Sequence, residues 1–308
     1  MTAPGGSSAP PDLTVPVILG PTGVGKSRAA FEIARRLGGE IVVCDSRQVY
    51  DRLDIATNKP SHEEMQAVPY HLVGVADPST TFNVFHFVQA AGAALADIAR
   101  RGRLPLVEGG SMLWADALLD GFSLSGVPPR PERRAELELQ PLDRLAEQLH
   151  RLDPEARLDE LNRARLVRAI EVLEVAGPPL ARLRRRVPPP WTALRIGLTA
   201  QLSVIDERLA ARSREQVERG VVAETRAALA SGVSPQAPVL SGIGYAEAVA
   251  FLRGEIELEQ LPETMARANR RYARRQLRWL RRDQRITWFD AALDPVPSIL
   301  EFLRERLN

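Results

Sequence analysis

Short apolar runs alternate with amphipathic stretches over the first 120 residues of the chain. Residues 15–20, 41–44 and 104–107 are mainly aliphatic, and each run is short enough to form a buried strand. Apolar residues recur at helical spacing over residues 26–37 and 82–101. Because strands that alternate with helices form a parallel sheet covered by helices, this pattern predicts an α/β fold.

The pattern changes between residues 121 and 190. Charged helical segments are interrupted there by prolines, in SGVPPRPERR, GPPL and VPPPW, and no clear strand is visible. Residues 194–198 (LRIGL) then predict a return strand, which helical patterns follow. We therefore predict a core of residues 14–120 and 191–308 that carries a helical insertion, residues 121–190.

The composition is that of a globular protein with a large core. Of 308 residues, 44% are hydrophobic and 26% charged, and no run of about eighteen apolar residues predicts a membrane span. Residues 1–13 are rich in Pro, Gly and Ser and lack the apolar region of a signal peptide, so we expect a flexible tail. One cysteine, Cys44, and four histidines exclude an internal disulfide and the usual zinc fingers. We expect a monomer in the cytoplasm.

Almost all basic residues are arginines, since lysine occurs only at Lys26 and Lys59. The net charge of +2 conceals an arginine-rich segment, residues 267–285. Spacings of three and four place one set along one side of a predicted helix: Arg267, Arg271, Arg274, Arg278, Arg281 and Arg285. The insertion adds Arg130, Arg133, Arg134, Arg163, Arg165, Arg168 and Arg184 to Arg186. Each cluster is either a solvated face or a footprint for nucleic-acid phosphates, and the pattern leaves both open.

The strongest motif fits GxxxxGK[ST] in the required context between a strand and a helix. It consists of Gly20, Pro21, Thr22, Gly23, Val24, Gly25, Lys26 and Ser27. Such a P-loop turns its backbone N–H groups inward around a phosphate, and the following helix presents the positive end of its dipole. Lys26 adds a point charge, and the hydroxyl of Ser27 can bind Mg²⁺. The motif predicts a diphosphate or nucleotide site, and it leaves open whether ATP binds there.

Two carboxylates accompany the other predicted strands. Asp45 follows the strand of residues 41–44, and ligands of open parallel sheets bind beyond the carboxyl ends of strands, so we expect Asp45 beside the P-loop. The alternative is that Asp45 caps the N-terminus of a helix, and the local pattern leaves both open. Glu108, in LPLVEGG, is the candidate for the acidic metal ligand that kinases place after a later strand.

Beyond the P-loop, the chain resembles the tRNA dimethylallyltransferases, also called tRNA isopentenyltransferases. The resemblance is carried by blocks in family order: GPTGVGKS, CDSRQVYDRLDIATNKP, YHLVGVADPSTTFNVFHF, EGGSMLW, ALLDGF, RLVRAIEVLEVAG, GIGYAEAV and RRYARRQLRWLRR. They extend from residue 14 to around residue 289. Several consecutive blocks are far more specific than a P-loop alone.

The resemblance implies a P-loop NTPase-like sheet and a prenyl-transfer reaction. The P-loop would hold the diphosphate of dimethylallyl diphosphate together with Mg²⁺. The acceptor would be the exocyclic N6 amine of the adenosine immediately 3′ of the anticodon in tRNA, and diphosphate would be released. The helical insertion would contact the anticodon stem-loop of the tRNA.

The resemblance also assigns chemical roles. Asp45 would be the general base on the amine, while Thr22 and Ser111 would lie beside the diphosphate and the acceptor. Arg208 or Arg212 would reach the leaving group, and the sequence leaves that choice open. The catalytic candidates are therefore Asp45, Lys26, Ser111, Arg208 and Arg212. The candidate metal ligands come from the P-loop motif and the kinase pattern, and they are Ser27 and Glu108.

The resemblance places further residues against the tRNA. Ser46, Arg47 and Gln48 would line the pocket for the adenine. The full set of positions that match tRNA contacts is Asp45, Ser46, Arg47, Gln48, Ser111, Arg133, Arg163, Arg165, Arg168, Gly244, Tyr245, Arg271, Arg274 and Arg278.

The chain departs from the family pattern at several positions. Glu108 stands where the family usually has an apolar residue, and residues 158–162 (LDELN) replace the common HPND. Gly242 and Asn269 replace a more usual Ala or Cys and a Thr, and the insertion is short. These departures concern the docking of tRNA more than the chemistry.

Three other functions are compatible with a P-loop. A small-molecule or nucleotide kinase would transfer phosphate from ATP, but it would leave the DSRQVY block without a role. An isopentenyltransferase acting on free adenine nucleotides would not need the long, arginine-bearing second half. A non-catalytic P-loop RNA-binding protein would bind tRNA and release no diphosphate.

Overall fold

The computed structural model describes residues 13–121, 127, 130–183, 186 and 188–307. Residues 1–12 of the predicted tail, as well as Arg184 and Arg185, lie outside the described residues. The chain forms two compact units, residues 1–118 with 190–308 and residues 119–189. In the described part of the chain, no helix is both long enough and apolar enough to cross a membrane.

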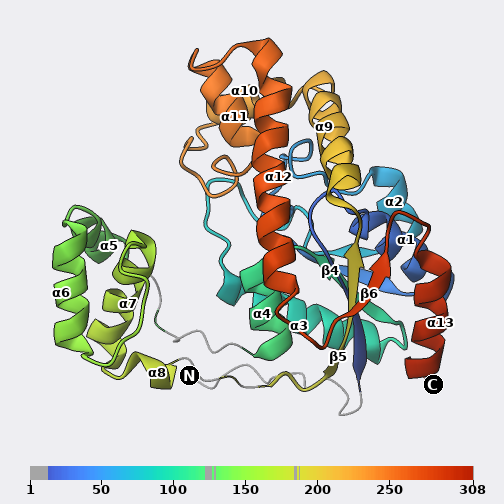
Figure 1. The fold of residues 1–308 in the computed structure, drawn as a ribbon, viewed down its shortest axis with the longest axis horizontal. Helices are drawn as coiled ribbons and strands as arrows, with labels where there is room; N and C mark the ends of the chain where they lie inside the picture. The colour runs from blue at the N-terminus through green and yellow to red at the C-terminus, as the bar shows by residue number, and fades with distance from the viewer. Residues whose placement is uncertain (1–12, 122–126, 128–129, 184–185, 187, 308) are drawn as a thin grey trace. The chain divides into compact units, whose positions relative to one another are not determined.

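A six-stranded sheet forms the centre of the larger unit (Figure 1). Its strands are β1 (Thr14–Leu19), β2 (Glu40–Cys44), β3 (Tyr70–His71), β4 (Pro105–Gly109), β5 (Thr192–Thr199) and β6 (Thr287–Asp290). They lie in the order β3-β2-β4-β1-β5-β6, and every pairing is parallel. The predicted α/β fold with a parallel sheet is confirmed. The four predicted strands are shifted by one or two residues, and the short edge strands β3 and β6 were not predicted.

Helices cover both faces of this sheet and extend beyond it. They are α1 (Lys26–Leu37), α2 (His62–Ala67), α3 (Val84–Arg100), α4 (Met112–Asp120), α9 (Leu202–Glu218), α10 (Val221–Ala230), α11 (Tyr245–Leu252), α12 (Leu261–Leu280) and α13 (Val296–Leu307), with a 3₁₀ turn at Leu258–Gln260. Helix α3 begins two residues later than predicted because the side chain of Asn83 accepts hydrogen bonds from the N–H groups of Phe85 and His86 and caps it.

The core follows from the alternation of side chains along the strands. Ile18, Ile41 and Ile196 point to one face of the sheet and pack in one cluster with residues of α1 and α13. The buried residues of α3, such as Phe87 and Leu95, lie outside that cluster, although α3 contacts β2 and β4. Strands β1, β2 and β4 are therefore buried on both faces, as their nearly continuous apolar runs indicate.

The smaller unit is a helical bundle with its own core. Its helices are α5 (Pro131–Glu138), α6 (Leu142–Leu152), α7 (Arg163–Ala176) and α8 (Leu180–Leu183). Leu137, Leu145, Leu149 and Ile170 are fully or almost fully buried in one apolar cluster. This cluster is separate from the core around the sheet, so the burial of its own apolar side chains stabilises the helices of this unit.

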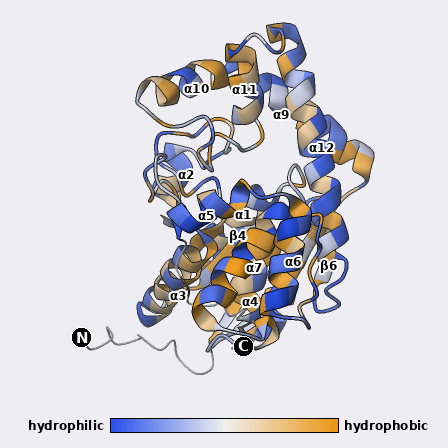
Figure 2. Ribbon diagram, turned by 90° about the vertical axis from the view of Figure 1, so that its left-hand side faces the viewer, coloured by the Kyte–Doolittle hydropathy of each residue, from blue (hydrophilic) through white to orange (hydrophobic). Residues whose placement is uncertain are grey.

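Helix α12 is the arginine-rich helix of the sequence, and it runs beside α9 beyond the sheet (Figure 1). Its ribbon is hydrophilic over much of its length (Figure 2). It ends at Leu280, so Arg285 does not lie on the helix as predicted, and its guanidinium instead contacts the carboxylate of Asp283. Arg281 occupies the C-cap position.

Candidate active site

The P-loop connects β1, which lies inside the sheet, with α1. Gly23 and Gly25 have φ angles of 83° and 101°, in the left-handed region where a side chain would be strained. A Cβ at Gly20 would lie 2.9 Å from the carbonyl oxygen of Leu198 on β5, so this position also requires glycine. Lys26 Nζ donates to the carbonyl of Pro21 at 3.0 Å, so the lysine folds back over the loop that it follows.

Glu108 meets the P-loop from the neighbouring strand β4. The hydroxyl of Ser27 donates to Glu108 Oε1 at 3.1 Å, and Glu108 is only 3% exposed. Burial raises the pKa of Glu108, and the charge of Lys26 opposes that rise. Burial lowers the pKa of Lys26, against the attraction of Glu108 and Asp45. These side chains therefore form one coupled group of charges at the carboxyl end of the sheet.

Asp45 follows β2 and lies in the same group. Its Oδ1 accepts the N–H of Arg47 at 2.8 Å and that of Gln48 at 3.4 Å. The residues after it form a turn, so the carboxylate caps a turn and not the helix considered as the alternative. Burial nevertheless raises the pKa of Asp45, and the two backbone hydrogen bonds only partly offset that effect. A carboxylate with a raised pKa is suited to accept a proton.

Ser111 lies at the start of α4 and joins the end of β4 to the segment after β2. Its Oγ accepts the N–H of Ser46 at 2.9 Å and lies 3.2 Å from the hydroxyl of Ser46. Ser111 is 7% exposed, so its hydroxyl is held by these contacts. It positions the segment that begins with Asp45.

The two arginines of α9 have different partners. Arg212 Nη2 donates to Thr22 Oγ1 at 2.9 Å, and its buried Nε has no hydrogen-bond partner among the described residues. Arg208 donates to the backbone carbonyls of Val24 at 3.1 Å and Ala291 at 3.2 Å. Burial lowers the pKa of Arg212, while the charge of Asp45 opposes that change. Arg212 therefore keeps a buried donor without a partner among the described residues at the site.

Two adjoining cavities meet at these residues. The first, of about 390 Å³, contains the P-loop side chains and Glu108. The second, of about 290 Å³, is lined by Ser46, Arg47 and Ser111. Their shared wall consists of Thr22, Asp45, Thr57, Asn58, Arg212 and Tyr272. A phosphate-binding cavity and a second cavity thus share one carboxylate and one arginine.

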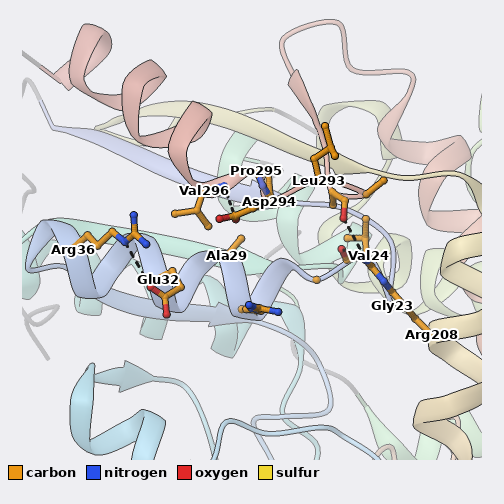
Figure 3. Close-up of a pocket in the computed structure, with 14 residues that line it drawn as sticks. Gly23, Val24, Ala29, Glu32, Arg36, Arg208, Leu293, Asp294, Pro295 and Val296 are labelled. Carbon is orange, nitrogen blue, oxygen red and sulfur yellow. Dashed lines mark hydrogen bonds and ion pairs between the residues drawn. The ribbon is translucent and has the colours of Figure 1, made fainter.

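A larger cavity of about 630 Å³ lies between α1 and the segment of residues 291–296. Figure 3 shows Arg208 passing between Val24 and the loop of Leu293 there, and the wall includes Ala29, Glu32 and Asp294. Neither Asp45 nor Lys26 lines this cavity. Arg208 therefore ties the P-loop to the loop after β6, and it also lines the P-loop cavity.

Some residues that hold the site together were missed in the sequence. Glu224 of α10 accepts the N–H groups of Asp54 and Ile55 and the hydroxyl of Tyr245, so it fixes the loop that carries Thr57 and Asn58. No motif in the sequence marks Glu224. Asn269, noted as a departure from the family pattern, approaches Arg212 Nη2 at 3.4 Å from α12.

The residues predicted to contact tRNA from the core differ in exposure. Arg271 and Arg278 are exposed and have no acidic partner among the described residues. Arg274, by contrast, forms a two-pronged ion pair with Asp206 of α9. Tyr245 is 1% exposed, and a buried side chain offers no surface to an RNA, so its predicted direct contact is not supported. Gly244 has a φ of 95°, and a Cβ there would lie 2.6 Å from the Cβ of Ala56, so this position requires glycine for packing.

The predicted tRNA-contacting arginines of the insertion mostly have internal partners. Arg133 pairs with Glu174, and Arg163 donates to the carbonyl of Glu138. Arg168 pairs with Glu171, and its Nη2 donates to the carbonyl of Val127. Arg165 is exposed, and its guanidinium has no partner within the described residues. Arg165 is therefore the member of this set that is free to meet a phosphate.

The fold and the cavities define a class of protein: a P-loop α/β protein in which the cavity at the P-loop adjoins a second cavity. The chain belongs to the IPP transferase family, whose model matches residues 48–283. A model for isopentenyl transferases matches residues 13–72. These matches confirm the family that the sequence motifs indicated.

Curated relatives agree with this assignment. A tRNA dimethylallyltransferase of Thermomicrobium roseum is 40% identical over 300 residues, which cover 96% of this chain and 90% of the relative. Another tRNA dimethylallyltransferase, from Roseiflexus castenholzii, is 40% identical over 290 residues, with 92% and 94% covered.

Solved structures share the fold. A tRNA isopentenylpyrophosphate transferase from Bacillus halodurans has a TM-score of 0.73 and 34% identity, and 96% of each chain is covered. A eukaryotic dimethylallyltransferase acting on tRNA has a TM-score of 0.79 and 26% identity, over 91% of this chain and 74% of that one.

Proposed function

We propose that the chain transfers a dimethylallyl group from dimethylallyl diphosphate to the N6 amine of the adenosine 3′ of the anticodon in tRNA. The observation that carries this proposal is the meeting of two cavities at Asp45 and Arg212, one of them built on the P-loop. The donor diphosphate occupies the P-loop cavity, and the adenine occupies the cavity beside Ser46 and Arg47. The names of the relatives support both substrates.

The acceptor amine needs a base because its lone pair is delocalised into the adenine ring. As the amine nitrogen bonds to the allylic carbon, the C–O bond to diphosphate breaks and its electron pair leaves with the diphosphate. Asp45 takes the proton that the amine loses. Its raised pKa and its place on the shared wall of the cavities suit this role.

The leaving diphosphate gains negative charge as the bond breaks. Lys26, the Nε of Arg212 and the N–H groups of the P-loop are the donors that face it in this proposal. Such donors stabilise a transition state more than a ground state when they are fixed in advance. The bonds from Arg212 to Thr22 and from Lys26 to Pro21 fix both side chains.

Mg²⁺ fits this site. Ser27 and Glu108 offer a hydroxyl and a carboxylate oxygen in hydrogen-bond contact inside the P-loop cavity, and Mg²⁺ prefers oxygen ligands, including water and substrate phosphate. The described residues contain no group of three or more His, Cys, Asp or Glu that could hold a metal ion, so the remaining ligands would come from water and diphosphate. When bound, the ion would neutralise charge on the leaving diphosphate.

The tRNA surface is proposed from unpaired arginines. Arg267, Arg271 and Arg278 form an exposed row on α12 without acidic partners in the described chain, and Arg165 offers a similar charge in the insertion. Backbone contacts of this kind hold an RNA whose target base must leave the stack before its amine can react. The cytoplasmic location and the monomeric state remain predictions.

A transfer assay separates the possible functions. The protein is incubated with labelled dimethylallyl diphosphate and either tRNA, AMP or ATP, and the label is followed into each acceptor. We expect label in tRNA alone, with equimolar release of diphosphate. Label in AMP would indicate a transferase for free nucleotides, and tRNA binding without transfer would leave only an RNA-binding protein. Phosphate transfer from ATP would indicate a kinase.

A further inference from the structure

Gln276 is a buried amide on the inner side of α12, with 2% of its surface exposed. Its Oε1 accepts the N–H of Thr22 in the P-loop at 2.8 Å. Its Nε2 donates to the carbonyl of Gly110, after β4, also at 2.8 Å. Both ends of the amide are therefore engaged by backbone groups of two different active-site segments.

The contact at Gly110 is closely fitted. A Cβ at Gly110 would lie 2.4 Å from Gln276 Nε2, so glycine at this position makes room for the amide. The hydroxyl of Tyr272, one turn earlier on α12, also donates to the carbonyl of Gly110, at 3.4 Å. Helix α12 thus holds the Gly110 segment with two side chains.

These contacts join the donor side of the site to the acceptor side. Thr22 also accepts the hydrogen bond from Arg212. Ser111, next to Gly110, holds the N–H of Ser46, which follows Asp45. The chain of contacts from Thr22 through Gln276 and Gly110 to Ser111 therefore links the phosphate loop with the segment that begins at the base.

We propose that Gln276 is a positioning residue for prenyl transfer, which sets the separation between the P-loop that holds the donor and the segment that holds the acceptor. This proposal rests on the proposed function. Neither the base nor a donor to the leaving group is lost when Gln276 is changed, because both amide ends bind backbone. A misplacement of about 1 Å between reacting groups can cost roughly 100-fold in rate.

The first test replaces Gln276 with Leu, which fills similar space and forms neither hydrogen bond. With Gln276→Leu we expect single-turnover transfer at saturating donor and tRNA to fall by ~10- to 100-fold. The KM for donor and the Kd for tRNA should stay near the wild-type values. Leu277→Met, in the neighbouring apolar position on α12, is the control for packing and should transfer at the wild-type rate.

The second test uses Gln276→Glu as a rescue that depends on pH. When the introduced carboxyl group is ionised, it can accept the N–H of Thr22 but cannot donate to Gly110, whereas the protonated group can do both. The rate of Gln276→Glu relative to wild type should therefore rise as the pH falls. A purely structural role would lower the melting temperature without this change in the ratio.

The outcomes are separable. If wild type transfers no label to tRNA, the proposed function fails. If wild type transfers label and Gln276→Leu matches it, or if Gln276→Glu shows a ratio independent of pH, the positioning role is wrong. If Gln276→Leu has both a lower transfer rate and a lower melting temperature, the rate of Gln276→Glu relative to wild type decides, through its dependence on pH.

Discussion

The active site and the helical insertion both bury charged side chains. They differ in whether other groups of the protein pair with those charges. In the insertion, Glu171 is fully buried and accepts hydrogen bonds from the backbone of Arg130 at 3.0 Å and from Arg134 Nη2 at 2.5 Å. Burial alone would raise the pKa of Glu171, but these bonds and the charge of Arg168 hold it below its ordinary value. The charge of the Glu171 carboxylate is therefore paired within the insertion itself.

Around the P-loop, burial prevails over pairing. It raises the pKa of Asp45 and Glu108 and lowers that of Lys26 and Arg212. Arg212 Nε and Gln48 Oε1 are buried without partners in the described chain. Shifted and incompletely paired groups that share a cavity mark a place where a ligand completes the pairing. Complete pairing, as at Glu171, marks a structural role.

The largest effect is expected at Asp45, the proposed base. Asp45→Asn keeps an oxygen for the N–H groups of Arg47 and Gln48 but cannot take a proton, so single-turnover transfer should slow by roughly 10²- to 10⁴-fold. Binding of donor and tRNA should change little. A variant that transfers at a near wild-type rate would leave Asp45 as the cap of its turn and nothing more.

The ionisation of Asp45 also predicts how the transfer rate and the stability of the fold change with pH. Only the carboxylate is a base, so the wild-type rate should fall as the pH drops through the raised pKa of Asp45. Because burial raises this pKa in the folded state, ionisation above it destabilises the fold, and Asp45→Asn should melt no lower than wild type at neutral pH. A clear loss of melting temperature would contradict this reasoning.

A smaller effect is expected at the phosphate grip. Lys26→Ala should slow transfer by about 10²- to 10³-fold and weaken donor binding, because a preorganised donor to the leaving group is lost. The Kd for tRNA should barely change. Lys59, the other lysine, already pairs with Asp54 at 2.5 Å, so Lys59→Ala is a matched control with a smaller expected loss. Equal losses of transfer rate in Lys26→Ala and Lys59→Ala would contradict the distinction between Lys26 and the ion-paired Lys59.

The insertion should respond in stability and not in chemistry. Glu171→Ala removes the shared partner of Arg134 and Arg168 and should cost about 1–3 kcal/mol in the unfolding free energy of that unit. Hydrogen exchange should speed up in residues 130–176 and stay unchanged in the sheet. Glu136→Ala, which removes an exposed ion pair with Arg133, is the control and should have a small effect.

The sequence predicted the parts of the fold that local patterns determine. The P-loop, Asp45 after its strand and the parallel sheet follow from short-range spacing, so they were accessible. The edge strand β6 and the contacts of Gln276 and Glu224 depend on packing between segments far apart in the chain. The spacing of the arginines was visible too, but whether each one is paired depends on residues such as Asp206 and Glu174 that no helical period reveals.

The smallest effect is expected on the salt dependence of tRNA binding. It compares a paired arginine with an unpaired one on the surface of α12. Arg278 is exposed and has no acidic partner in the described chain, while Arg274 is held by Asp206 at 2.7 Å. Arg278→Gln should weaken binding of all tRNAs about equally and reduce the slope of log K against log salt by about one unit. Arg274→Gln should change the slope less, because Asp206 already neutralises that charge. Arg165→Gln and Arg133→Gln form the corresponding pair in the insertion. Equal slopes in wild type and in Arg278→Gln and Arg165→Gln would mean that these arginines are solvated and that the tRNA lies elsewhere.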